Sequence, residues 1–193
     1  MADFKQAIKF VLMHEGGYAE TAAGEVVNRG VNTDTLKALG YPGTKDELKQ
    51  IVKNLTVEET EDIYYKFYWT FHKPSITDAL DQLKSQSAGN KILDMAVLSG
   101  QRTAIKLVQR ALGLTEDGYF GQGTFNHADA MGDSLAAKLV QVWTTSLSDI
   151  ADHRIAEAQA KGDAKLEKYW TQVKRGWLAR ASWDGVDPRG NSL

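Results

Sequence analysis

Glu15 is the acidic residue whose position best fits a proton donor. It lies on the apolar stripe of a helix that is predicted to begin near Phe4 and to be ended by Gly16-Gly17. The apolar members of that stripe are Phe4, Ile8, Val11 and Leu12. A carboxyl there is partly removed from water and faces the negative end of the helix dipole, and both effects favour the protonated acid. General acid catalysis at a glycosidic oxygen needs such a group, whereas the ordinary alternative is a surface glutamate at a fraying helix end.

The irregular segment after this helix holds the candidates for a second carboxylate. Residues 18–33 are interrupted by glycines and have no helical period, and loops of that length are often functional. Glu20 and Glu25 lie in this segment, and Asp34 follows at the start of the next helix. A glycosidase usually pairs its acid with a nucleophile or with a base for water. For each of the three taken singly, an ordinary solvated loop or capping residue is the favoured interpretation, and the remaining option is that Glu15 works alone.

A run of aromatic residues between positions 64 and 71 offers flat faces on which sugars could stack. One helical face, which we expect in the core, consists of Tyr64, Phe67, Tyr68 and Phe71. Tyr65 and Trp69 share another face, and they are candidates to line a groove. Core packing is the alternative for this second pair as well.

Metal and cofactor chemistry finds no support in the residue pattern. The histidines are scattered at positions that fit no zinc spacing, namely His14, His72, His127 and His153. Asp117-Gly118 lacks the alternating oxygen ligands and the final glutamate of a calcium loop, so a tight turn is predicted there. The chain has no cysteine, which excludes disulfides and thiolate ligands. We therefore assign no metal and no cofactor.

Composition narrows the class of protein and of partner. The chain has 193 residues, 42% of them hydrophobic, and a formal net charge of -2. These values exclude global disorder and argue against nucleic acid, whose binding normally needs a basic excess. No apolar stretch approaches the ~18 residues that span a bilayer, so we expect no stable membrane insertion. The lysine-containing N-terminal stretch predicts an amphipathic helix rather than a signal peptide, so synthesis in the cytoplasm and delivery by another route are expected.

Almost every periodic segment repeats at three and four residues, so the predicted fold is all-α, without a convincing strand. Helices are expected over residues 4–15, 34–39, 45–54, 56–72, 75–87, 91–98, 102–112 and 135–162, with a last helix ending near residue 181. Ala88-Gly89-Asn90 is expected to separate the helix over 75–87 from the helix over 91–98. The tail from Ser182 has no apolar period and is expected to be loosely ordered.

Several motifs, in order along the chain, resemble glycoside hydrolase family 108, the muramidase-type lysozymes of phage endolysins and of bacterial secretion activators. The N-terminal motif is His14-Glu15-Gly16-Gly17-Tyr18, and the middle helix carries Glu58-Glu59, Ile63-Tyr64 and Tyr68-Trp69. The segments that resemble the family's C-terminal peptidoglycan-binding region are residues 93–100, 108–114, 117–121 and 176–180.

The resemblance implies a lysozyme-like helical fold whose catalytic part, residues 1–92, packs on a helical part, residues 93–181, followed by a tail, residues 182–193. It implies hydrolysis of the bond between N-acetylmuramic acid and N-acetylglucosamine in peptidoglycan, with Glu15 as general acid. The chain departs from the family pattern in residues 21–33, where the usual Asp-Pro-Gly-Gly element is absent, and at Leu98, where Asn is common. Glu25 and Thr33 are the residues placed to take the second catalytic role.

The predicted substrate-binding residues are Tyr18, Asn28, Tyr65 and Trp69. A monomer is expected, delivered by a holin or a phage particle to the cell wall or periplasm. Two alternatives stay open. One is a lytic transglycosylase that uses Glu15 alone, and the other is a non-catalytic wall-binding or virion structural protein.

Overall fold

The computed structural model describes residues 1–21, 24–70 and 79–186. Its elements are α1 (Phe4–His14), β1 (Ala19–Glu20), β2 (Val26–Asn28), β3 (Val31–Asn32), α2 (Thr33–Ala38), α3 (Lys45–Asn54), α4 (Val57–Tyr64), the π-helical turn η1 (Tyr65–Trp69), α5 (Ala79–Gln82), α6 (Gln86–Ser99), α7 (Gln101–Leu112), α8 (Gln122–Met131), α9 (Ser134–Ala160) and α10 (Ala164–Ala181). The predicted helical class is confirmed. Helix α8 was not predicted. Of the helix expected over 75–87, residues 75–78 lie outside the described residues, and the rest is α5, a short non-helical segment and the start of α6.

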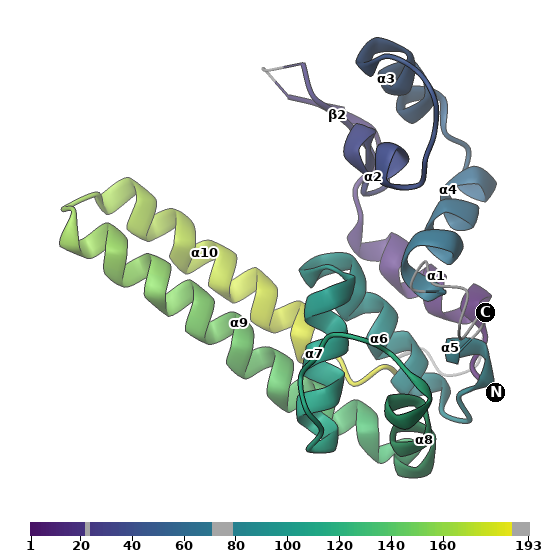
Figure 1. The fold of residues 1–193 in the computed structure, drawn as a ribbon. Coiled ribbons are helices and arrows are strands. Elements are labelled where there is room, and N and C mark those ends of the chain that lie inside the picture. The colour runs from purple at the N-terminus through teal and green to yellow at the C-terminus, as the bar shows by residue number, and fades with distance from the viewer. Residues whose placement is uncertain (22–23, 71–78, 187–193) are drawn as a thin grey trace.

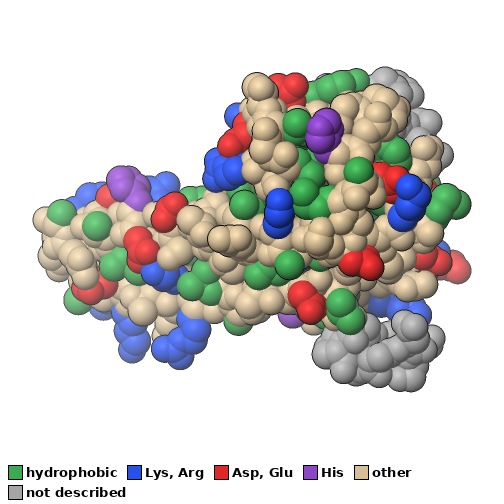
Figure 2. Space-filling view, turned by 90° about the horizontal axis from the view of Figure 1, so that it is seen from below, with side chains coloured by type: hydrophobic (Ala, Val, Ile, Leu, Met, Phe, Trp, Pro, Cys, Tyr) green, Lys and Arg blue, Asp and Glu red, His purple; other side chains and the backbone are tan. Residues whose placement is uncertain are grey.

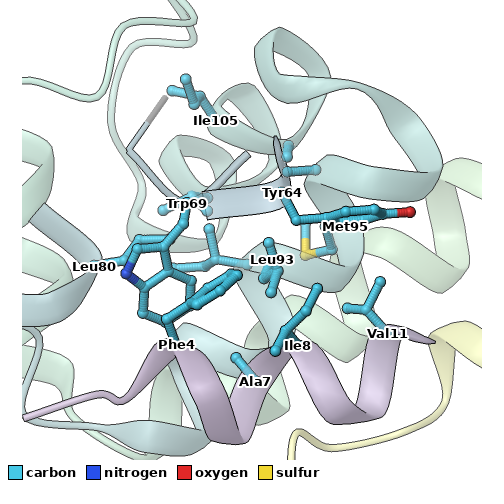
Figure 3. Packing of buried hydrophobic residues seen from close by; sticks show 14 of the residues in the cluster. Phe4, Ala7, Ile8, Val11, Tyr64, Trp69, Leu80, Leu93, Met95 and Ile105 are labelled. Atoms are coloured by element: carbon cyan, nitrogen blue, oxygen red, sulfur yellow. The ribbon is translucent and has the colours of Figure 1, made fainter. Parts of the chain in front are cut away.

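The core forms around α6, which packs against α1, α7 and α9. Helix α1 begins at Asp3, whose side chain accepts a hydrogen bond from the Gln6 amide, and it turns Phe4, Ile8 and Val11 toward α6 (Figure 3). The predicted apolar stripe of the first helix is therefore the face that it buries.

Helices α9 and α10 form a long antiparallel hairpin that projects from the body of the molecule (Figure 1). We call this hairpin the arm. The space-filling view shows the arm as a protrusion with Lys and Arg side chains on its surface (Figure 2). In the described part of the chain, no helix is both long enough and apolar enough to cross a membrane.

A small antiparallel sheet in the order β1-β2-β3 follows α1, and it was not predicted. Its strands have only two or three residues each, so no alternating pattern can develop in the sequence. Arg29 and Gly30 form the two-residue turn between β2 and β3, and both have positive φ, 48° and 78°. This combination is the one that a tight hairpin turn requires.

The predicted helix break at Gly89 is wrong, because α6 begins at Gln86 and runs through it. Ser85 caps this helix by accepting a hydrogen bond from the Ala88 amide. A Cβ on Gly89 would lie 2.8 Å from the Cβ of Ala2 and 3.3 Å from the Trp69 ring. Gly89 therefore allows close packing rather than ending a helix. The predicted boundary between residues 92 and 93 falls inside α6.

The predicted core position of Tyr64 is confirmed, whereas the groove position considered for Trp69 is wrong. The chain forms a π-helical turn there. The Thr70 amide bonds to the Tyr65 carbonyl, which widens the turn by one residue and changes which side chains point inward. Trp69 is fully buried, packs edge-on against Phe4 and donates to Asp81 Oδ1 at 2.6 Å. Its ring is therefore part of the core rather than of a groove. Phe71 lies outside the described residues.

The described part of the C-terminal tail is packed rather than loose. The Trp183 ring stacks on Phe10, with 3.2 Å between centroids and 7° between planes. Asn90 on α6 donates to the carbonyl of the buried Gly185 at 2.9 Å. The expected loose order of residues 182–186 is therefore wrong, and residues 187–193 lie outside the described part.

Candidate active site

Glu15 follows the last residue of α1, with an extended backbone (φ -87°, ψ 129°). Its amide still donates to the Val11 carbonyl at 3.2 Å, so the last turn of α1 fixes the position of the Glu15 backbone. The side chain is 19% exposed. The predicted position at the end of an apolar stripe is thus correct to within one residue. The result is a carboxyl that is mostly enclosed and still reached by solvent.

The turn between β2 and β3 approaches this carboxyl closely. A Cβ on Gly30 would lie 2.8 Å from Glu15 Oε2 and would collide with the Tyr64 hydroxyl. Tyr64, from α4, donates its hydroxyl to the Arg29 carbonyl at 2.9 Å and so holds the turn in place. Gly30 is required here both by its positive φ and by the space that it leaves.

Arg180, near the end of α10, binds the other oxygen of the same carboxyl. Its Nη1 lies 3.0 Å from Glu15 Oε1, and its Nε lies 2.7 Å from Asp94 Oδ1. Asp94 is fully buried on α6, and burial raises the pKa of its carboxyl while the Arg180 charge opposes that rise. One guanidinium therefore joins an acid from α1 to an acid from α6.

Tyr64 and Tyr68 form a second wall beside Glu15. Burial, together with the Glu15 charge, raises the pKa of both hydroxyls above its ordinary value of 10. A hydrogen bond with Thr35 acts on Tyr68 in the opposite direction. Both tyrosines therefore stay protonated near neutral pH, as the hydrogen bond from Tyr64 to the Arg29 carbonyl requires.

The predicted second carboxylates lie on the β1–β2 hairpin. Glu25 forms a 2.5 Å ion pair with Lys45, at the first residue of α3, and this contact lowers the pKa of Glu25. Glu20 accepts a hydrogen bond from the Tyr18 hydroxyl at 3.0 Å. Strand β2 lies apart from α1, beside α2 (Figure 1). Asp34 is exposed in the first turn of α2, after the buried Thr33.

The residues predicted to bind substrate are placed in different environments. Tyr18 is 42% exposed and directly follows the glycine pair after Glu15. Asn28 is buried and donates to the Val52 carbonyl at 3.0 Å, so its amide caps the end of α3. Tyr65 is partly buried, and its hydroxyl donates to Asp81 Oδ2 at 2.8 Å. Tyr18 is therefore the most exposed of the four, and it is also the nearest to Glu15 in the sequence.

The sequence-based prediction missed Asp94 and Arg180 as site residues. A signal for Asp94 was present, because it and Lys91 interrupt an otherwise apolar run, and charges inside a buried helix need partners. For Arg180 the surrounding segment was singled out by its motif, but nothing in the sequence placed it near Glu15, 165 residues earlier. Among the described residues, no three His, Asp or Glu side chains gather as a metal site.

Comparison with known proteins gives one family and one solved structure that resemble this chain. Residues 8–100 match the family model described as glycosyl hydrolase 108, a range that contains Glu15, Gly30, Tyr64 and Asp94. The structure titled "Structure of Brucella abortus SagA" is 27% identical, covers 96% of this chain and 97% of its own, and superposes with a TM-score of 0.62. No curated protein matches the chain. The match over residues 8–100 supports a glycoside hydrolase similar to glycosyl hydrolase family 108, which implies peptidoglycan as the substrate.

Proposed function

We propose that this protein is an N-acetylmuramidase that cleaves the bond between N-acetylmuramic acid and N-acetylglucosamine, with Glu15 as general acid. The observation that carries the proposal is the fixed, partly exposed Glu15 carboxyl, held between Gly30 and Arg180 within the family-matched region. A carboxyl that protonates a leaving-group oxygen must be held in one geometry and still reach the substrate.

The two oxygens of Glu15 have different surroundings, and this assigns them different roles in the proposal. Oε1 accepts a hydrogen bond from Arg180, so the proton to be transferred belongs on Oε2. Oε2 faces the Gly30 turn, where the absence of a side chain leaves room for this oxygen. In this mechanism Oε2 donates its proton to the glycosidic oxygen as the bond to the anomeric carbon breaks.

Glu25 and Thr33 stay predictions for the second catalytic role. The low pKa of Glu25 keeps it ionised, as a nucleophile or base for water needs. If Glu25 has this role, Glu25→Gln removes most activity, whereas Lys45→Gln, which removes only its partner, leaves most of it. Near-normal turnover by the Glu25→Gln variant would end this assignment.

A lytic transglycosylase is the second candidate, and the contacts of the loop carboxylates favour testing it. Glu25 is paired with Lys45 and Glu20 with Tyr18, whereas a transglycosylase needs only one acid/base group. Mass spectrometry of the products separates the two reactions. Hydrolysis leaves reducing muramic acid ends, and transglycosylation leaves anhydro ends.

The direct test is release of soluble muropeptides from purified peptidoglycan by wild type, Glu15→Gln and the control Glu58→Gln. Glu58 is an exposed glutamate on α4, so its substitution keeps the charge change and leaves the site intact. We expect release by wild type and control and none by Glu15→Gln. Binding of peptidoglycan without release by any of the three would support a non-catalytic wall-binding or virion role instead.

Delivery belongs to the same proposal. Residues 4–14 form α1, which packs on α6 and positions Glu15. We propose release through a holin, or transport in a phage particle, as an endolysin or virion lysozyme. Lysis of a host that expresses the chain with and without a holin is the corresponding test.

A further inference from the structure

We infer that Arg180 is a positioning residue for Glu15, and that the arm therefore supplies part of the active site. The inference rests on the proposed function of Glu15 and goes beyond it. The family match ends at residue 100, whereas Arg180 lies on α10, at the far end of the chain. The family-matched region would then be incomplete as a catalyst without the arm.

The first argument is the geometry of the guanidinium. Arg180 uses Nη1 for Glu15 and Nε for Asp94, so a single rigid plane fixes both acids. Its side chain is only 12% exposed, which keeps water from competing for these contacts. An arginine held on one side by Asp94 can orient Glu15 on the other.

The second argument is the unfavourable free energy of burying these charged groups. Within the described residues, Asp94 Oδ2 and Arg180 Nη2 are buried without a hydrogen-bond partner. Buried polar atoms are normally satisfied, and a buried ion pair is weak evidence for stability because desolvation offsets its attraction. A buried group of three charges that ends at the proposed acid is better explained by a role in the site.

The third argument is the way the end of α10 is anchored. Lys91, fully buried on α6, donates to the Ala181 carbonyl at 2.8 Å, and its ammonium lies 4.5 Å from the centre of the Trp143 ring. The residue next to Arg180 is thus held by the same helix that carries Asp94. Backbone and side chain at positions 180 and 181 are both fixed on α6, so Arg180 has little freedom to leave Glu15.

The charged groups around the Glu15 carboxyl single out Arg180. Glu15 faces Arg180 from α10 and Tyr64 and Tyr68 from α4 and η1, while Arg180 faces Asp94 and Lys91 from α6. His14, on α1, also acts on Asp94. Among the described residues, Arg180 is the cation that forms an ion pair with Glu15.

The experiment compares wild type with Arg180→Lys, with the double variant Asp94→Asn/Arg180→Gln, and with Arg175→Gln as control. The double variant removes both charges, so no unpaired carboxylate is left in the core if the single variant fails to fold. Arg175 is an exposed arginine on the same helix. Near-ultraviolet circular dichroism establishes that each variant is folded.

For the double variant we expect kcat on soluble glycan-strand fragments to fall about 10²-fold with KM little changed, as for a displaced catalytic group. Arg180→Lys, which keeps the charge and loses the rigid fork, should fall between wild type and the double variant. Arg175→Gln should equal wild type. A folded double variant with wild-type kcat would overturn the inference.

A second readout needs no turnover. In protein labelled with ¹³C at the Glu carboxyls, the Glu15 resonance is assigned by its loss in Glu15→Gln. At one fixed pH it should move in the double variant and stay in place in Arg175→Gln. An unmoved resonance would contradict the inference even if no muropeptide is released. Absence of release from wild type, with the resonance moved, would instead reject the proposed function alone.

Discussion

The base and the outer part of the arm carry ion pairs of very different character. At the base, Arg180 joins Glu15 and Asp94 with side chains that are 12%, 19% and 0% exposed. Farther out, Lys174 pairs with Asp152 at 2.6 Å, with side chains that are 28% and 55% exposed. The two sets have similar distances, so distance does not distinguish them. Burial does, because water screens the outer pair and not the inner one.

The arm therefore has a buried end, which packs on the body of the protein, and an outer end that is exposed to solvent. At its base the arm packs on α6 and contacts the proposed acid, whereas at its outer end it exposes Leu166 and Tyr169. Substitutions at the two ends should therefore differ in effect even where they remove the same kind of contact.

The largest effect on stability is expected from Arg180→Met. It leaves the fully buried Asp94 without its partner, and loss of one member of a buried pair costs about 3–5 kcal/mol. Urea denaturation measures the free energy of unfolding, with Lys174→Met as the matched control from the outer pair. We expect no measurable change in the control, and equal losses in both variants would erase the distinction between the two ends.

The next effect concerns Lys91, whose pKa burial lowers from 10.5 to about 8. Between these values the folded chain has lost the proton while the unfolded chain still binds it, so stability rises with pH. The gain across this range is on the order of 3 kcal/mol. Lys91→Met should abolish it. The measurement is the difference in unfolding free energy between wild type and variant at pH 7, 8, 9 and 10.

Using that difference removes the opposing contribution of Tyr64, whose raised pKa makes stability fall with rising pH once the unfolded tyrosine ionises. A wild type and a variant with parallel pH dependence would show that Lys91 is not desolvated as its burial implies.

A smaller loss is expected from Gly30→Ala, which strains the turn below Glu15. The added Cβ meets Oε2 of Glu15 and the Tyr64 hydroxyl, and a positive φ disfavours alanine, at a cost of about 1–3 kcal/mol. Muropeptide release should fall as well, because the carboxyl is displaced. Gly40→Ala is the control, since Gly40 also has a positive φ and nothing lies within 4 Å of its Cβ position. Equal activity in the two variants would remove Gly30 from the site.

The smallest effect is expected from Asp152→Asn at the outer pair of the arm. We expect unchanged thermal stability and unchanged muropeptide release, because both partners are in contact with water. Differential scanning calorimetry and the release assay measure these two quantities. A clear loss of either would show that the outer part of the arm has a role that its exposure does not indicate.

Much of the fold could be predicted from the sequence because its long helices have strong local signals. Thr56 and Glu59 form a capping box at the start of α4, where a helix was expected from residue 56. Gly113 ends α7 in the left-handed conformation, directly after the helix expected over 102–112. These signals depend on a few neighbouring residues, so they can be recognised without the tertiary structure.

The remaining features depend on residues that are distant in the sequence. Gly89 looks like a helix breaker until Ala2 and Trp69 are seen packed against it. The π-helical turn over Tyr65–Trp69 alters which side chains face inward, and no local sequence motif predicts it. The site shows the same division: Glu15 could be predicted from its own helix, whereas its contact with Arg180 exists only because α10 returns to α1.

Release of muropeptides by wild type and by Glu15→Gln, with Glu58→Gln as control, is the measurement that tests the central claim most directly. The account predicts release by wild type and by the control and a loss of at least about 10²-fold in Glu15→Gln, the usual contribution of a general acid. Release by a folded Glu15→Gln variant at the wild-type rate would contradict it.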